Sequence, residues 1–145
     1  MKHRKIQMNK NYIPLPCDIG DEVFRNGFFH FNISRIVEHI QSGILEVELD
    51  TIEVKDWFKH HFHSRINEEH LPTVDVNKPI IQAEIRPNMY EIIDGNHRIE
   101  KAYREDILTI QSYKLKGEQL LPYFTEKQRY VAYVEYWNLK IKDHF

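Results

Sequence analysis

The sequence predicts an α+β protein in which helices flank a small sheet, and three patterns support this prediction. Apolar and polar residues alternate over 45–54 and over 109–115, which is typical of strands with one buried face. Residues 79–85 and 90–93 are two short apolar runs joined by an Arg-Pro-Asn turn, the pattern of a hairpin. Apolar residues recur at helical spacing in three further segments, residues 33–42, 96–106 and 126–142.

The composition is that of an ordinary globular domain. The chain has 145 residues, of which 41% are hydrophobic and 29% are charged. The net charge of −2 provides no general attraction to DNA or to an anionic membrane, although a local basic patch would still allow a DNA partner. The lone Cys17 fits a reducing compartment, and no run approaches the ~20 apolar residues of a membrane span. We therefore expect a cytoplasmic protein with no membrane partner.

A single domain of three parts is expected. The parts are an N-terminal helical extension over 1–46, a core over 47–116 and a long C-terminal helix over 117–145. Residues 1–12 are polar, and we interpret them as a solvated tail. Asn32 is a candidate N-cap for the helix that begins at Ile33 and that Gly43 ends.

The C-terminal helix carries an aromatic-rich stripe. Its members recur at helical spacing and are Tyr130, Tyr133, Val134, Trp137 and Ile141. Apolar helix faces are usually buried, so we interpret the stripe as core or as a contact with a second copy of the chain. A platform for stacking nucleobases is the less favoured interpretation, and a homodimer stays open.

The first predicted strand contains an irregularity. Its alternation changes phase at Asp50-Thr51, which a β-bulge or a turn between two short strands would explain. Residues 56–58 then open a short helical or irregular segment.

Residues 60–72 contain a short predicted helix and several histidines. The helix is expected over 68–71, capped by Ser64 or Asn67 and closed by Pro72. The histidines are His60, His61, His63 and His70. Imidazole is a common zinc ligand, but no cysteine accompanies these residues and their spacing is not that of a known zinc site. We therefore favour a structural or surface role for them.

The most informative stretch is 89–104. Its apolar run 90–93 has the composition of a buried strand, and Asp94-Gly95-Asn96 then breaks the strand, since Gly tolerates backbone angles that are closed to other residues. In the helix that follows, three residues at i, i+3 and i+4 form an apolar face for the core, namely Ile99, Ala102 and Tyr103. The other side of this helix carries His97, Lys101 and Arg104, with Arg98 flanking.

A strand, a glycine turn and a helix that begins with His and Arg form a suitable site for an anion. The first N–H groups of a helix have no intrahelical partner, and the positive end of the helix dipole lies there. Phosphate is the natural guest. The residues expected to bind it are Gly95, Asn96, His97, Arg98 and Lys101. The alternative is structural, with Asn96 acting only as an N-cap. The run Asn-His-Arg after Gly95 favours the functional interpretation.

The same residues carry a resemblance to a known superfamily. The pattern Ile-Ile-Asp-Gly-Asn-His-Arg at 92–98, with Ala102 four residues later, resembles the signature turn of the ParB/sulfiredoxin-like superfamily and is nearest to the Asp-Gly-His-His-Arg turn of the free-serine kinases. Three further segments resemble the superfamily's opening strand, its first helix and the strand before the turn, namely residues 47–54, 66–71 and 78–83. The resemblance covers 47–116 and implies a small mixed sheet with flanking helices that binds a nucleotide, ATP or CTP.

The resemblance also implies a reaction. Transfer or hydrolysis of phosphate needs charge stabilisation, usually by Mg²⁺, and a base for the nucleophile. In the free-serine kinases an acidic residue after the opening strand works with the Asp of the glycine turn. The matching residue in this chain is Asp56, with Glu53 and Glu68 as alternatives. We therefore expect Asp94 to orient Mg²⁺ or the substrate, Asp56 to act as the base, and His97 to complete the catalytic set.

Two departures from the relatives narrow the choice of function. Sulfiredoxin needs a cysteine directly after the turn glycine, where this chain has Asn96, so sulfinic acid repair is not expected. ParB clamps carry a helix-turn-helix after the nucleotide domain, whereas mainly one long helix follows Gly117 here. Sequence-specific DNA binding of the ParB kind is therefore not expected.

Three functions remain, in order of preference. The first is a nucleotide-binding domain that hydrolyses or transfers a phosphate, as an NTPase or a nucleotide-dependent kinase. The second is a metal-dependent nuclease on the same scaffold. The third is a non-catalytic module that binds a ligand or a partner.

Overall fold

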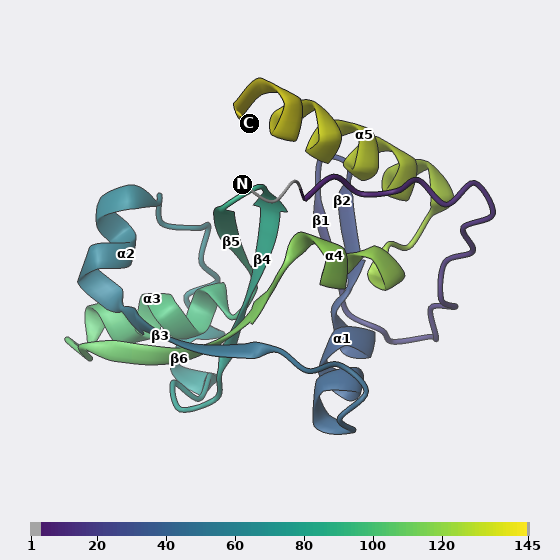
Figure 1. Ribbon diagram of the computed structural model, residues 1–145. Helices are drawn as coiled ribbons and strands as arrows, with labels where there is room; N and C mark the ends of the chain where they lie inside the picture. Colours follow the sequence, from purple (N-terminus) through teal and green to yellow (C-terminus); the bar gives the residue numbers. More distant parts are fainter. Residues whose placement is uncertain (1–3, 145) are drawn as a thin grey trace. The chain divides into compact units, whose positions relative to one another are not determined.

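The computed structural model describes residues 4–144 and has the predicted α+β architecture (Figure 1). Its strands are β1 (Val23–Asn26), β2 (Phe29–Asn32), β3 (Glu48–Glu53), β4 (Ile80–Arg86), β5 (Met89–Asp94) and β6 (Thr109–Leu115). Its α-helices are α1 (Ile33–Gln41), α2 (Val54–His60), α3 (Asn96–Arg104), α4 (Gly117–Leu120) and α5 (Lys127–His144), and two 3₁₀ segments are η1 (Leu71–Thr73) and η2 (Leu121–Tyr123). None of the described helices has the length and apolar character that crossing a membrane requires.

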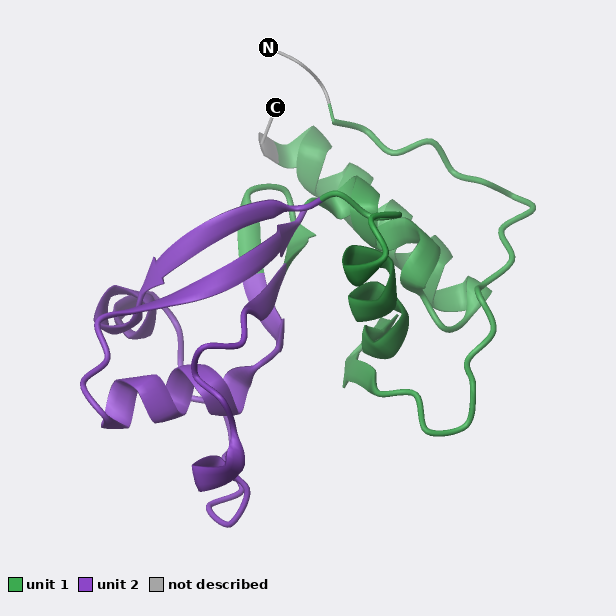
Figure 2. Ribbon diagram, turned by 90° about the horizontal axis from the view of Figure 1, so that it is seen from below, with its two compact units in different colours: residues 1–46, 83–90, 116–145 green, residues 47–82, 91–115 purple. Residues whose placement is uncertain are grey.

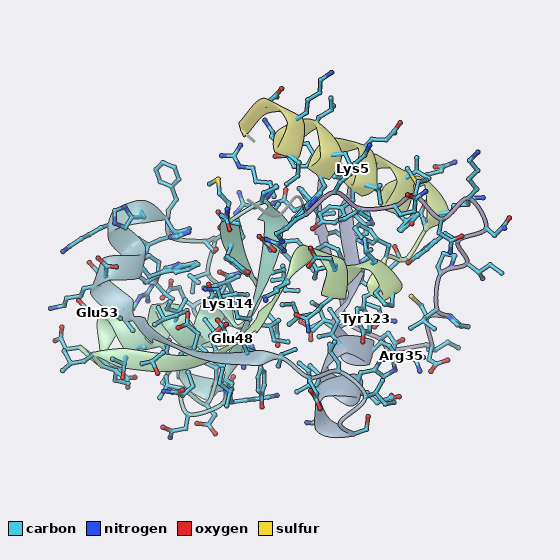
Figure 3. The ribbon with its side chains drawn as sticks, viewed as in Figure 1. Lys5, Arg35, Glu48, Glu53, Lys114 and Tyr123 are labelled. Atoms are coloured by element: carbon cyan, nitrogen blue, oxygen red, sulfur yellow. The ribbon has the colours of Figure 1, made fainter. Side chains whose placement is uncertain are left out.

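Two sheets organise the strands. β1 and β2 pair with each other in antiparallel orientation, and the other four strands form one sheet in the order β3-β6-β4-β5. β3 runs antiparallel to β6 without interruption, from Glu48 opposite Lys114 to Glu53 opposite Thr109. At one end of β3 a carboxylate oxygen of Glu48 lies 3.9 Å from Nζ of Lys114. Figure 3 labels these two residues and Glu53, which lies at the other end of β3, where α2 begins.

The change in apolar–polar alternation at Asp50-Thr51 of the first predicted strand does not come from a β-bulge or a turn. The continuous register with β6 leaves no bulge or turn at Asp50-Thr51. Ile52 and Val54 face the core, whereas the side chain of Leu49 belongs to the opposite face and its residue is 65% exposed. The apolar residues before position 50 therefore do not mark the buried face.

The chain divides into two compact units (Figure 2). Unit 1 consists of residues 1–46, 83–90 and 116–145, and unit 2 consists of residues 47–82 and 91–115. The predicted division into an extension, a core and a C-terminal helix stays a prediction.

The core of unit 2 is aliphatic. Its buried members are Ile52, Val54, Ile80, Ile92, Ile99, Ala102 and Ile110. Trp57 and Phe58 of α2 pack against this cluster. Tyr103, expected in the core, is exposed, because Ile99 and Ala102 already provide the buried face of α3. The Tyr103 ring lies edge-on to Phe58, with ring centroids 5.1 Å apart.

In unit 1 the aromatic stripe of α5 is buried, as predicted for core residues. Trp137 approaches the backbone closely at Gly117, where a Cβ atom would lie 2.4 Å from the indole ring. The N-cap predicted for α1 is confirmed, since the side chain of Asn32 accepts a hydrogen bond from the amide of Arg35. Glycine at position 117 thus allows the close contact with Trp137, and asparagine at position 32 stabilises the start of α1.

The N-terminal segment is not a solvated tail. Ile6 and Tyr12 are buried, and the Tyr12 ring stacks on Tyr130 at 3.8 Å between centroids. Arg4 donates two hydrogen bonds of 2.7 Å to the buried carboxylate of Glu84. A buried carboxylate needs a cation to offset its charge, and Arg4 provides it for Glu84. This ion pair and the burial of Ile6 and Tyr12 hold the segment against the rest of unit 1 although its composition is polar. Residues 1–3 of the predicted tail lie outside the described residues.

The helix predicted over 68–71 is a turn followed by η1. The Asn67 side chain accepts hydrogen bonds from the amides of Glu69 (3.1 Å) and His70 (3.3 Å). Asn67 is therefore a capping residue as expected. The turn does not continue as a helix, because the amide of Leu71 bonds the Asn67 carbonyl at 3.1 Å but the next residue, Pro72, has no N–H. Pro72 itself lies inside η1.

Candidate functional site

The glycine turn has the geometry that the sequence indicates. Gly95 connects β5 to α3 with a φ angle of +101°, a conformation that side chains rarely adopt. A Cβ atom at this position would lie 2.4 Å from Cγ2 of Ile80, so the packing also requires glycine. Gly95 itself is the N-cap of α3, and Asn96 is the first helical residue, which corrects the N-cap alternative for Asn96.

Three backbone amides begin α3 ahead of its hydrogen-bond ladder. The first bond of the ladder joins the amide of Ile99 to the carbonyl of Gly95 at 3.1 Å. The amides of Asn96, His97 and Arg98 precede this bond, so the helix offers them no acceptor. They lie at the positive end of the helix dipole. The turn therefore has the donors that an anion requires.

The side chain of Arg98 forms an ion pair and hydrogen bonds with other residues of unit 2. Its guanidinium forms an ion pair of 2.9 Å with Asp94, and the two side chains are 9% and 15% exposed. It also donates to the carbonyl oxygens of Pro79 (2.6 Å) and Lys78 (3.4 Å). Arg98, which the sequence suggested as a direct phosphate ligand, thus fixes the position of Asp94 and of the chain before β4.

The outward face of α3 is covered by residues 67–74. Lys101 donates to the carbonyl oxygens of Pro72 (3.0 Å) and Val74 (2.9 Å). Arg104 binds both carboxylate oxygens of Glu68, at 2.6 and 2.9 Å. These two side chains were expected on the face away from the core, and the structure places them there, engaged with this segment. An open hollow of about 300 Å³ lies beside them, lined by Leu71, Pro72, Lys101, Arg104 and Glu105.

His97 also contacts this segment. Its Nε2 atom accepts a hydrogen bond of 3.0 Å from the amide of Asn67, so Nε2 is unprotonated in this arrangement. The His97 ring lies 5.0 Å from the ring of His70, centroid to centroid. Burial and the neighbouring His70 lower the pKa of His97, against the opposing effect of Glu68. His97 is therefore held in its neutral form.

The carboxylates proposed as base lie in different surroundings. Asp56 is exposed in the first turn of α2, and among the described residues no hydrogen bond or ion pair connects it to the Gly95 turn. Glu53 is exposed at the end of β3 (Figure 3). Glu68 is paired with Arg104, whose hydrogen bond lowers the pKa of this carboxyl. Of the acidic candidates, Asp94 is the one that the structure places at the turn.

Three of the four histidines in residues 60–70 have partners in the structure, namely His61, His63 and His70, whereas His60 is exposed. His61 stacks on Trp57 at 3.6 Å between ring centroids and donates from Nδ1 to the Trp57 carbonyl at 3.0 Å. Within the part of the chain that the structure describes, no group of three His, Cys, Asp or Glu side chains could hold a metal ion.

Glu100 was missed at the sequence level. Its carboxylate is 8% exposed and binds Nδ1 of His63 through one oxygen and Nε of Arg104, at 2.9 Å, through the other. Burial opposes its ionisation, but the hydrogen bonds from His63 and Arg104 prevail and lower the pKa of Glu100. The i, i+4 spacing of Glu100 and Arg104 on one helix was the available signal.

Comparison of the chain with protein-family models, with curated proteins and with solved structures gave no match.

Proposed function

We propose that the chain binds the phosphate groups of a nucleotide, ATP or CTP, at the turn from Asp94 to Arg98, and hydrolyses or transfers a phosphate, as a protein of the ParB/sulfiredoxin-like type. The conformation of Gly95 carries this proposal. It joins β5 directly to α3, so that three successive amides precede the first hydrogen bond of the helix. A phosphate at this end would accept hydrogen bonds from these amides and would be stabilised by the helix dipole.

The side chains of the turn divide into two roles. Asn96 and His97 directly follow Gly95 and are partly exposed, so they are the candidates for contact with phosphate oxygens. Arg98 is a positioning residue, because its ion pair and its bonds to backbone carbonyls hold Asp94 at the turn. Asp94 would contribute a carboxylate oxygen to Mg²⁺, whose charge offsets that of the phosphates when the ion is bound.

A second candidate is a binding module without catalysis. Arg98 and Lys101 donate to backbone carbonyls, and His97 accepts from a backbone amide. Side chains that stabilise the fold in this way leave the backbone amides as the main phosphate donors. Such a site would bind an anion without activating it.

Calorimetric titration of ATP and of CTP, each with Mg²⁺, tests the proposal. We expect one of the two to bind saturably to the wild type, and about tenfold more weakly to His97→Ala, since a lost hydrogen bond to a charged group costs on the order of 1.5 kcal/mol. His60→Ala, which removes an exposed histidine of α2, should bind like the wild type. Phosphate release in the same samples distinguishes the enzyme from the binding module. Absence of binding by both nucleotides would contradict the proposal.

A further inference from the structure

His63 is held on three sides in unit 2. Phe58 stacks on one face of the imidazole, with ring centroids 3.8 Å apart and planes 1° from parallel. Tyr103 lies edge-on to the same imidazole at 4.8 Å. At the Nδ1 end, the ring is bonded to the carboxylate of Glu100. The side chain is nevertheless 42% exposed, so the ring is fixed in orientation while part of it remains open to solvent.

The partner of His63 determines which nitrogen carries the proton. Both oxygens of Glu100 are engaged, one by His63 and the other by Arg104, and Arg104 in turn binds Glu68. An ionised carboxylate only accepts hydrogen bonds, so Nδ1 of His63 must be the donor. In the neutral imidazole the other nitrogen, Nε2, then holds a free lone pair. The buried carboxylate would also stabilise the imidazolium that forms when Nε2 takes up a proton.

This arrangement is connected to the glycine turn through α3. Glu100 follows Asn96 by four residues, which is about 6 Å along the helix axis. The same loop that carries His63 continues to Asn67, whose amide binds His97. His63 therefore belongs to the segment that contacts the first two turns of α3.

We infer that His63 is the proton acceptor of the proposed reaction and that Glu100 is its positioning residue, in place of Asp56. This inference rests on the proposed function. The observation that supports it is an imidazole whose ring is fixed by Phe58 and Tyr103 and whose Nδ1 is fixed by a buried carboxylate. Asp56 has no comparable support, since among the described residues no hydrogen bond, ion pair or ring contact holds its side chain.

The reaction step is hydrolysis of the terminal phosphoric anhydride of the nucleotide. A water molecule gives one proton to Nε2 of His63, while its oxygen lone pair forms the new bond to phosphorus. The bond from phosphorus to the bridging oxygen breaks, and the nucleoside diphosphate leaves with that electron pair. The imidazolium, paired with Glu100, then returns its proton to solvent. With a hydroxyl group in place of water, the same transfer yields a phosphate ester.

Four variants test the assignment by phosphate release and, in parallel, by nucleotide titration. His63→Gln should reduce turnover by about 100-fold or more, as expected for loss of a general base, and should leave the nucleotide affinity unchanged. Glu100→Gln should reduce turnover less and move the acidic limb of the pH–rate profile, because it changes the charge next to the imidazole. Glu68, Arg104 and Tyr103 are the other ionisable groups of this cluster, and all remain in that variant. His60→Gln is the control and should keep wild-type turnover, and Asp56→Asn tests the alternative base.

The results of these measurements separate the two proposals. If the nucleotide binds and His63→Gln keeps wild-type turnover, the inference is overturned while the proposed binding stands. The inference is also overturned if the wild type binds nucleotide but releases no phosphate at any pH with Mg²⁺. If Asp56→Asn alone abolishes turnover, the base is Asp56. If neither nucleotide binds, the proposed function fails and the inference fails with it. His63→Gln alters a partly exposed ring, and its unfolding curve shows whether it is folded.

Discussion

At the scale of single residues, Gly95 is defined by two independent requirements. Its φ angle of +101° is unfavourable for other residues, and Ile80 occupies the space that a side chain would need. Gly43 also has a positive φ angle, +81°, but a Cβ atom there would meet nothing within 4 Å. A substitution at Gly43 therefore measures the cost of the backbone conformation alone, whereas one at Gly95 adds the cost of the steric clash with Ile80.

We predict that Gly95→Ala lowers the free energy of unfolding by about 3 kcal/mol, because backbone strain and overpacking against Ile80 act together. Gly43→Ala should cost about 1 kcal/mol, from backbone strain alone. Urea denaturation of both variants measures the difference. Equal losses in the two variants would show that the contact with Ile80 is unimportant.

His97 should make the stability of the protein depend on pH. Burial and His70 lower its pKa in the folded state, so the folded protein binds the proton less readily than the unfolded chain. Its contribution is fully present above the ordinary histidine pKa of about 6.5 and is lost as the pH falls from there through the lowered pKa of the folded state.

The expected result is a decrease in the free energy of unfolding between pH 7 and pH 5 that is smaller in His97→Gln than in the wild type. Urea denaturation at several pH values measures it, and His60→Gln controls for the removal of an exposed histidine. A slope that is unchanged in His97→Gln would contradict the assignment of Nε2 as an acceptor for Asn67.

At the scale of secondary-structure elements, the four strands of the larger sheet and the long helices were predictable from the sequence. The hairpin of β1 and β2 was not, because a helical extension was expected over 1–46. β6 and the hairpin of β4 and β5 follow the predicted runs closely, and α5 buries the predicted stripe. The errors concern short segments. Residues 68–70 form a turn instead of a helix because Pro72 has no N–H with which to continue the hydrogen-bond pattern. Which side chains of β3 face the core is set by its pairing with β6, and the alternation of apolar and polar residues within β3 does not specify that pairing.

The N-terminal segment of unit 1 is an element whose role sequence periodicity could not show. Arg4 binds the fully buried carboxylate of Glu84, which also accepts hydrogen bonds from the amides of Asn88 (2.7 Å) and Gly117 (2.9 Å). Burial opposes ionisation of Glu84, but these hydrogen bonds prevail and lower its pKa. The polar composition of residues 1–12 concealed this long-range contact.

Removal of the cation in Arg4→Met should lower the free energy of unfolding by about 3 kcal/mol, since it leaves the Glu84 charge buried without its ion pair. Glu118→Gln is the matched control, because Glu118 binds the same arginine from a largely exposed position and should cost under about 1 kcal/mol. Thermal and urea unfolding of both variants measure the two losses in the free energy of unfolding. A loss in Arg4→Met no larger than in Glu118→Gln would mean that the segment is not fastened by this pair.

At the scale of the whole molecule, the candidate site was predictable in location and less so in detail. The positions of Asp94, Gly95 and the first turn of α3 agree with the sequence analysis. Arg98 and Arg104 each pair with a carboxylate four positions earlier, which the helical spacing could indicate. The bonds of Arg98, Lys101 and Arg104 to Pro79, Pro72 and Glu68 could not be foreseen, because these residues lie at least 19 positions away in the chain. The contact of Glu100 with His63 could not be foreseen for the same reason, since His63 comes from a distant loop.

The proposed function depends on the backbone amides at the start of α3. The most direct test follows the ¹H–¹⁵N resonances of the protein during titration with ATP and with CTP, with adenosine and cytidine as controls. Binding of a phosphate at the turn predicts that one nucleotide shifts the amides of Asn96, His97 and Arg98 most strongly and that its nucleoside leaves them unchanged. If neither nucleotide moves these three resonances, the turn does not bind phosphate.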